Sequence, residues 1–260
     1  MQRNSSGWIR RSGRDAPARL ICFPYAGGSC SAFGGLQQHL PSIEICGVQL
    51  PGRQDRLAEP PLDDLVPLVE ALLIAMRPLL DKPFALFGYS SGAILAFELA
   101  HALRDVAGPA MRHLFVAAAG APQLGLDHPR IAELPVPQFL AELIALGGLP
   151  PELGSDPHLA DLVLPMLRAD VRWHENYVFR QRPSLTIPIT ALGGHDDRFV
   201  DVARLARWRD LTAGPFGLDL LPGGHLFIAD QHKTVAELIT RRFRCIQPAS
   251  NVSRNEVVNR

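Results

Sequence analysis

A serine between two glycines, at the end of an apolar run, is the first residue whose surroundings predict chemistry. The run Phe84–Phe87 leads directly into Gly88–Gly92, which reads GYSSG, and a helical pattern follows. In this G-x-S-x-G arrangement a strand turns sharply into a helix and presents the serine hydroxyl above a sheet. Glycines are needed because side chains at those two positions would collide with the neighbouring strand and helix. We therefore predict that Ser90 is a nucleophile.

A serine hydroxyl becomes a good nucleophile only when a base removes its proton, and two later loops offer the partners. One loop reads GGHDD and ends at Asp197, and the other reads PGGH and ends at His225. Each follows an apolar run, and the order serine, acid, histidine is the one expected after a G-x-S-x-G turn. His225 is the predicted base, with His174 as a minor alternative. Spacing alone leaves both Asp196 and Asp197 open as the acid.

Attack on a carbonyl also requires backbone N–H groups that stabilise the oxyanion. One donor is expected from the residue after the nucleophile, which is Ser91, and the second from the loop after an early strand. The glycine-rich loop Pro24–Gly28 fits that position. Its candidate donors are the N–H groups of Tyr25 and Ala26.

These segments belong to an alternation of strand and helix patterns. Short apolar runs bounded by Gly and Pro predict strands, and apolar residues at helical spacing predict helices. The predicted strands are Arg19–Phe23, Ile43–Leu50, Phe84–Phe87, His113–Ala119, Leu185–Leu192 and Leu218–Leu221. The predicted helices are Leu62–Leu80, Ile94–Leu103 and Lys233–Arg244. The alternation favours an α/β protein with a mainly parallel central sheet and helices on both faces. Together with the serine turn, it predicts the α/β-hydrolase fold.

The alternation is interrupted from about residue 131 to residue 180, where the pattern is helical, most clearly at 139–146 and 159–173. We expect a helical lid inserted into a single domain that spans residues 17–246, since such insertions often cover active sites. Residues 1–16 and 247–260 are polar and are expected to be flexible tails.

The bulk composition excludes some classes of protein. Basic and acidic residues are equal at 26 each, whereas nucleic-acid binders usually carry a basic excess. No run approaches the roughly 20 apolar residues of a membrane span, and the N-terminus lacks the apolar core of a secretory signal. The four cysteines are not spaced as metal ligands. We expect a monomeric cytoplasmic protein that binds neither nucleic acid nor membrane and needs no metal or cofactor.

With these motifs in place, the chain resembles the type II thioesterases that accompany polyketide synthases and nonribosomal peptide synthetases. The resemblance extends from about residue 20 to about residue 243. Its most specific stretches are Leu50–Arg53, which reads LPGR, and Arg168–Asp170, which reads RAD. The resemblance implies that Asp197 is the acid and that the N–H groups of Ala26 and Ser91 form the oxyanion hole.

The resemblance also implies the reaction. It is the hydrolysis of acyl thioesters on the phosphopantetheine arm of an acyl- or peptidyl-carrier protein, through Ser90, His225 and Asp197 and an acyl-enzyme intermediate. In the family this removes aberrant acyl groups from stalled carriers. Two alternatives stay open: a general carboxylesterase or lipase that acts on free esters, and a non-catalytic binding protein with the same fold.

The chain departs from the family pattern beside the serine. The family usually has histidine and methionine where this chain has Tyr89 and Ser91, and many members have histidine at the position of Tyr25. These departures leave the triad intact and bear on the shape and polarity of the acyl pocket. Four arginines that could meet an acidic carrier are otherwise expected to be solvated: Arg53, Arg56, Arg168 and Arg172.

Overall fold

The fold is built on an eight-stranded sheet with strand order β1-β2-β4-β3-β5-β6-β7-β8. It was obtained as a computed structural model that describes residues 2–3, 7–126, 129–145, 147, 149 and 157–244. The strands are β1 Gln2–Arg3, β2 Ile9–Arg11, β3 Ala18–Phe23, β4 Ile43–Val48, β5 Phe84–Tyr89, β6 Met111–Ala117, β7 Ile189–Gly194 and β8 Phe216–Leu221. β1 and β2 pair in antiparallel fashion, and β2 is also antiparallel to β4. All pairs from β4 to β8 are parallel, which confirms the predicted mainly parallel sheet.

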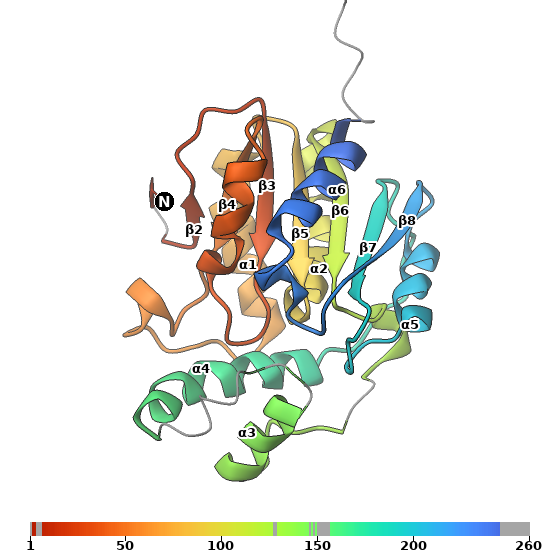
Figure 1. Cartoon of the computed structure of the whole chain (residues 1–260). Coiled ribbons are helices and arrows are strands. Elements are labelled where there is room, and N and C mark those ends of the chain that lie inside the picture. Colours follow the sequence, from red (N-terminus) through yellow and green to blue (C-terminus); the bar gives the residue numbers. More distant parts are fainter. Residues whose placement is uncertain are drawn as a thin grey trace, which may run out of the picture.

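Helices cover both faces of this sheet. They are α1 Leu65–Met76, α2 Ser91–Ala107, α3 Val136–Ala145, α4 Pro157–Glu175, α5 Val202–Ala206 and α6 His232–Arg244, with the 3-10 helix η1 at Cys30–His39. In Figure 1, α6 lies in front of the sheet and α1 and α2 lie behind it. The inserted helices α3 and α4 lie below, at the carboxyl ends of the parallel strands.

The strands are apolar on both sides because both faces are covered. In β5, Phe84 and Leu86 belong to the core cluster that includes α1 and α2. Ala85 and Phe87 belong to the second cluster, which includes η1 and α6. All four side chains are fully buried. This period of two is the reason that a central strand of a parallel sheet reads as a continuous apolar run.

The N-terminal segment differs from the prediction of a flexible tail. Ile9–Arg11 forms strand β2 on the outer side of β4, with Ile9 fully buried and the Arg10 guanidinium 2.6 Å from the Asp55 carboxylate. A strand of three residues carries too short a pattern to be predicted, and its partner lies far along the chain. The second predicted tail, residues 247–260, lies outside the described residues.

The inserted segment is held together by its own apolar cluster and by a buried carboxylate. Glu175, at the end of α4, accepts hydrogen bonds from the N–H of Ile131 at 2.6 Å and of Ala132 at 3.3 Å. These bonds join the beginning of the inserted segment to its end. The buried cluster consists of Ile131, Ala132, Phe139, Leu140, Leu143, Leu167 and Val171.

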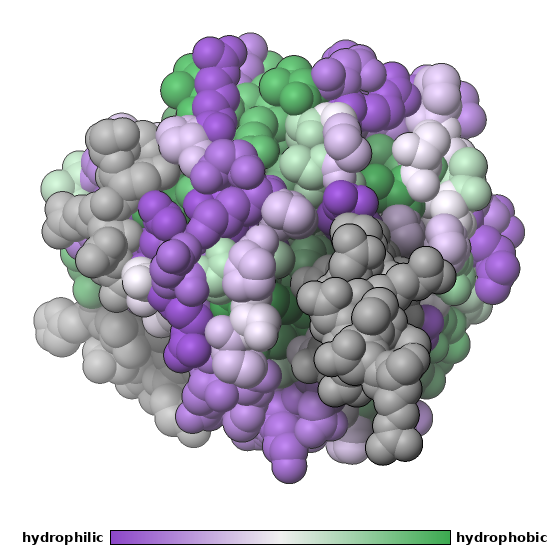
Figure 2. Space-filling view, turned by 90° about the horizontal axis from the view of Figure 1, so that it is seen from above, coloured by the Kyte–Doolittle hydropathy of each residue, from purple (hydrophilic) through white to green (hydrophobic). Residues whose placement is uncertain are grey.

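Polar side chains are spread over the face of the molecule that is seen from above. Figure 2 shows the molecule from above, with strongly hydrophilic residues across this face and hydrophobic residues between them. Within the described part of the chain, no helix has the length and apolar character that crossing a membrane requires.

A buried ion pair crosses the amino ends of β3 and β4, at the opposite end of the sheet from α3 and α4. The Glu44 carboxylate accepts from Arg19 Nε at 3.1 Å and from Arg11 Nε at 2.8 Å. The Glu44 side chain is 0% exposed and that of Arg19 is 4% exposed. Removing one partner of such a pair leaves the other as a buried uncompensated charge.

We therefore predict that Glu44→Gln lowers the free energy of unfolding by about 3–5 kcal/mol, because the buried Arg19 then keeps as counter-ion only Asp81, whose side chain is 61% exposed. Urea unfolding followed by circular dichroism measures this change. Asp15→Asn is the control: it breaks an ion pair with Lys82 in which Asp15 is 97% exposed, and it should leave the midpoint nearly unchanged. Equal midpoints for the Glu44 variant and the unmodified protein would contradict the prediction.

Candidate active site

The predicted nucleophile occupies a strained turn between β5 and α2. Ser90 has φ 52° and ψ −125°, a backbone conformation that L-residues rarely adopt. A Cβ on Gly88 would lie 2.4 Å from Ala93 Cα, and one on Gly92 would lie 2.3 Å from the Phe23 carbonyl oxygen. Only glycine fits at these two positions. The spacing of the motif is thus explained by backbone-to-backbone contact on both sides of the serine.

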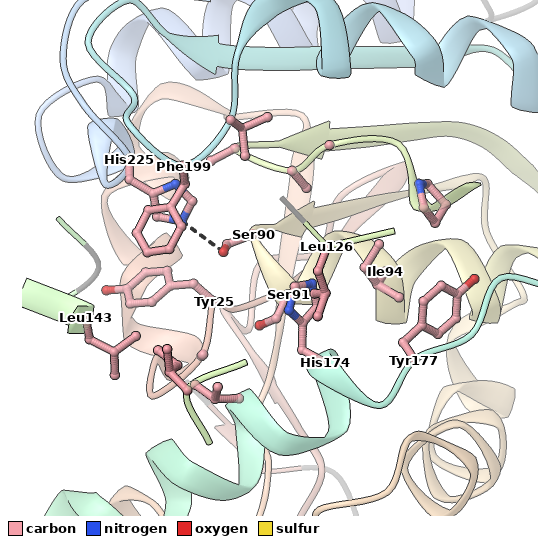
Figure 3. Close-up of a pocket in the computed structure, with 18 of the residues that line it drawn as sticks. Tyr25, Ser90, Ser91, Ile94, Leu126, Leu143, His174, Tyr177, Phe199 and His225 are labelled. Atoms are coloured by element: carbon pink, nitrogen blue, oxygen red, sulfur yellow. Dashed lines mark hydrogen bonds between the residues drawn. The ribbon is translucent and has the colours of Figure 1, made fainter. Parts of the chain in front are cut away.

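A continuous chain of hydrogen bonds joins the three residues that the sequence singles out. Ser90 Oγ lies 2.9 Å from His225 Nε2, and the dashed line in Figure 3 marks this hydrogen bond. His225 Nδ1 lies 3.0 Å from Asp197 Oδ2 and 3.2 Å from its Oδ1. The imidazole is 6% exposed and the carboxylate 1% exposed. A carboxylate only accepts, so Nδ1 carries a proton and Nε2 is left free to accept the serine proton.

The structure distinguishes the two aspartates that spacing left open. Asp197 turns inward because its Oδ1 accepts from the backbone N–H of Phe199 at 2.8 Å and of Val200 at 3.2 Å. Asp196 is exposed. The following helix α5 is capped by a third residue, Asp201, whose carboxylate accepts from an N–H of the first turn. Asp197 alone therefore contacts the histidine.

The loops after β7 and β8 are joined by hydrogen bonds, which places Asp197 and His225 side by side. His195 N donates to Leu221 O at 2.8 Å. A Cβ on Gly194 would lie 2.4 Å from the Gly223 carbonyl oxygen, so the loops approach at backbone distance. The Phe199 ring packs on the imidazole with 4.4 Å between ring centroids. That contact restricts rotation of the base, and no sequence motif pointed to Phe199.

The glycine-rich loop after β3 forms a tight turn beside the serine. Gly28 N donates to Tyr25 O at 2.8 Å, and Gly27 at the third position has φ +73°, the arrangement of a type II turn. Because a peptide unit is planar, fixing the Tyr25 carbonyl also fixes the direction of the Ala26 N–H. Ser91 is the first residue of α2, so its N–H has no acceptor within the helix. Ala26 and Ser91 both line the pocket that contains the serine hydroxyl.

The pocket lies between the carboxyl ends of the strands and the inserted segment, and its lining is mostly apolar. Ile94 of α2, His174 and Tyr177 also line it, and the Tyr177 hydroxyl donates to the Glu98 carboxylate at 2.7 Å. The inserted helices contribute Leu143, Leu167 and Val171. His174 was kept as an alternative base. It lines this pocket, whereas the serine hydroxyl contacts His225.

The departures from the family pattern divide into two groups. Tyr25 and Ser91 line the pocket, but Tyr89 is fully buried beneath the histidine loop. The Tyr89 hydroxyl donates to the His225 carbonyl at 2.6 Å and accepts from Ile228 N at 3.3 Å. Burial raises the pKa of this phenol well above its ordinary value, so it stays a neutral donor. Tyr89 therefore holds the His225 backbone and is not among the residues that line the pocket.

The expectation of solvated arginines is wrong for Arg53, whose side chain is 3% exposed and paired with Asp170 at 2.7 Å. Arg56 is also buried. Arg168 donates to carbonyl groups of the inserted segment. Arg172, which is 33% exposed, pairs with two carboxylates. Each of these four arginines is therefore buried or bonded to groups within the fold, which differs from the expectation that they are solvated.

Hydrogen bonds join a hydroxyl, an imidazole and a carboxylate at the carboxyl edge of a mainly parallel sheet. This arrangement defines a serine hydrolase with the α/β-hydrolase fold. The chain belongs to the thioesterase domain family, whose sequence profile matches residues 18–243. The predicted fold, enzyme class and family are thereby confirmed. The roles of the individual residues stay a prediction.

Two named proteins and one solved structure are similar to this chain over most of its length. The chain is 37% identical to the gramicidin S biosynthesis protein GrsT of Aneurinibacillus migulanus over 89% of this chain and 91% of that protein. It is 37% identical to the thioesterase PikA5 of Streptomyces venezuelae, over 96% and 93% of the two chains. The solved structure of the type II thioesterase BorB, from the borrelidin biosynthetic cluster, superposes with a TM-score of 0.84 at 35% identity, covering 94% of this chain and 100% of BorB.

We predict that Tyr89→Phe lowers the free energy of unfolding by about 1–3 kcal/mol, because the buried His225 carbonyl loses its donor. It should also reduce kcat, by up to about 100-fold, as the imidazole shifts away from the serine. The Michaelis constant KM should not change, because Tyr89 lies outside the pocket. Thermal unfolding and steady-state kinetics measure these effects. An unchanged kcat together with an altered KM would show that Tyr89 acts on substrate binding.

Proposed function

We propose that this protein hydrolyses acyl thioesters carried on the phosphopantetheine arm of carrier proteins, with Ser90 as nucleophile, His225 as base and Asp197 as the acid that orients it. The observation that carries the proposal is the hydrogen-bond chain of 2.9 Å and 3.0 Å that joins these side chains beside an apolar pocket. Membership of the thioesterase domain family supports thioesters as the substrate class. The similarity to a gramicidin S biosynthesis protein and to a type II thioesterase from a biosynthetic cluster supports a carrier-bound acyl group.

The first step of the proposed reaction is acylation. His225 Nε2 takes the proton of the Ser90 hydroxyl as Oγ attacks the thioester carbonyl, and Asp197 stabilises the imidazolium that forms. The carbonyl oxygen becomes an oxyanion that accepts hydrogen bonds from the N–H groups of Ala26 and Ser91. Each such donor contributes about 100- to 1000-fold to the rate. Collapse of the intermediate expels the thiol, which receives the proton from the imidazolium.

The second step releases the acid. His225 removes a proton from water, which attacks the acyl-serine carbonyl, and the same two N–H groups bind the second oxyanion. Collapse returns the proton to Ser90 and frees the carboxylic acid. The apolar walls of the pocket suit a hydrocarbon portion of the acyl group. We propose further that the enzyme acts as a monomer in the cytoplasm, where carrier-bound intermediates are made.

The triad assignment predicts unequal effects at two adjacent aspartates. Asp197→Asn should lower kcat by about 10,000-fold, because the amide no longer holds the required tautomer of His225. Asp196→Asn is the matched control and should have little effect, since Asp196 is exposed. Ser90→Ala should leave only the small rate enhancement that the oxyanion hole and substrate binding provide without a nucleophile. Assays with an acyl thioester of N-acetylcysteamine measure all three. Retained activity in Ser90→Ala would show that the site is wrong.

The substrate assignment predicts a preference among acyl donors. An acyl group loaded on the phosphopantetheine arm of a carrier protein should be hydrolysed with higher kcat/KM than the same acyl group in a simple oxygen ester. The carrier adds binding contacts that the ester lacks, while the reacting carbonyl meets the same triad. Mass spectrometry of the loaded and unloaded carrier follows the reaction. A clear preference for the free ester would assign the protein as a general carboxylesterase instead.

A further inference from the structure

A buried ion pair contacts the glycine-rich turn that follows β3. Arg53, in the loop after β4, donates from Nη1 and Nη2 to the two carboxylate oxygens of Asp170 on α4, at 2.7 Å and 2.9 Å. Both side chains are 3% exposed. Burying two charges is costly, and replacing such a pair by apolar residues is often neutral for stability. A stabilising role alone therefore does not explain this pair.

Arg53 Nε donates to the Pro51 carbonyl at 3.3 Å, and two further hydrogen bonds of the pair go to the turn that carries one of the proposed oxyanion donors. Asp170 Oδ2 accepts from the N–H of Gly27 at 2.8 Å, and Arg53 Nη1 donates to the carbonyl of Gly28 at 2.8 Å. One partner therefore holds an N–H of the turn and the other a carbonyl. Helix α4 also touches the turn, because a Cβ on Gly27 would lie 2.8 Å from Leu167 Cδ1.

We infer that Arg53 and Asp170 are positioning residues for the reaction, which hold the turn at Tyr25–Gly28 so that the Ala26 N–H faces the oxyanion. The inference rests on the proposed function, since it assigns these residues to the oxyanion hole of that reaction. The two charges offset each other, because Arg53 and Asp170 are paired. The pair can therefore order the Ala26 N–H without placing a net charge beside the turn. Helix α4 of the inserted segment thereby takes part in organising the site as well as covering it.

The test compares Asp170→Asn with Glu44→Gln, a matched variant at the buried ion pair far from the site. Asp170→Asn should lower kcat by about 10- to 100-fold, as expected for a misplaced catalytic donor, with KM little changed. An alkyl trifluoromethyl ketone is the second probe, because its adduct with serine carries an oxyanion. Its inhibition constant should rise in parallel with the loss of kcat/KM. Glu44→Gln should lower the unfolding temperature and leave both kinetic quantities unchanged.

Two results would overturn the inference. One is an Asp170→Asn protein that loses stability but keeps the kcat and the inhibition constant of the unmodified protein. The other is an equal loss of kcat in Glu44→Gln. If Asp170→Asn does not fold, Arg53→Lys replaces it: the charge is kept, the paired hydrogen bonds are not, and a wild-type kcat would again overturn the inference. Ser90→Ala is measured in parallel, because activity in that variant would overturn the proposed function itself.

Discussion

The left-handed backbone at Ser90 is the constraint on which the site depends. With φ 52°, this residue carries strain of about 1–3 kcal/mol that the surrounding structure must offset. Its N–H donates to the Ala117 carbonyl at 2.7 Å, and its own carbonyl accepts from Ala93 N at 2.8 Å. The turn is thus held between β6 and α2. Because β7 and β8 run parallel to β6, their loops end at the same edge as the serine, and the acid and the base reach it without any long excursion of the chain.

Buried polar groups around the triad do the positioning. The Tyr89 phenol holds the histidine loop by its backbone, two N–H groups of the acid loop orient the Asp197 carboxylate, and Asp170 holds an N–H of the glycine-rich turn. In each case a buried polar side chain makes at least two hydrogen bonds, which makes a displaced arrangement costly. The reacting atoms are therefore placed by contacts from several elements. The inserted segment contributes one of these contacts and four aliphatic side chains of the pocket (Ile131, Leu143, Leu167 and Val171), so it contacts both the pocket and the glycine-rich turn.

The sequence predicts those parts of the site that local patterns encode. The glycines around Ser90 and the loops ending at Asp197 and His225 are each recognisable within a few residues, as are the parallel strands that carry them. Arg53 and Asp170 are 117 residues apart, and nothing local distinguishes a buried arginine from a solvated one. Strand β2 was missed for a similar reason, since its stability comes from pairing with β4 and not from its own three residues. The direction of the Tyr89 side chain could have been predicted from the sequence. Tyr89 lies two residues after Phe87, so the period of a strand places both side chains on the α6 face.

The most direct test of the account is to trap the acyl-enzyme. The protein is mixed briefly with an acyl thioester, quenched in acid, digested and examined by mass spectrometry. The peptide that contains Ser90 should gain the mass of the acyl group minus one hydrogen. This acylated form should accumulate further at low temperature, where deacylation is slower. An acyl group found on another residue would contradict this prediction. Hydrolysis that proceeds while Ser90 stays unmodified at every quench time, or that continues in the presence of a reactive serine-directed phosphonate, would also contradict it.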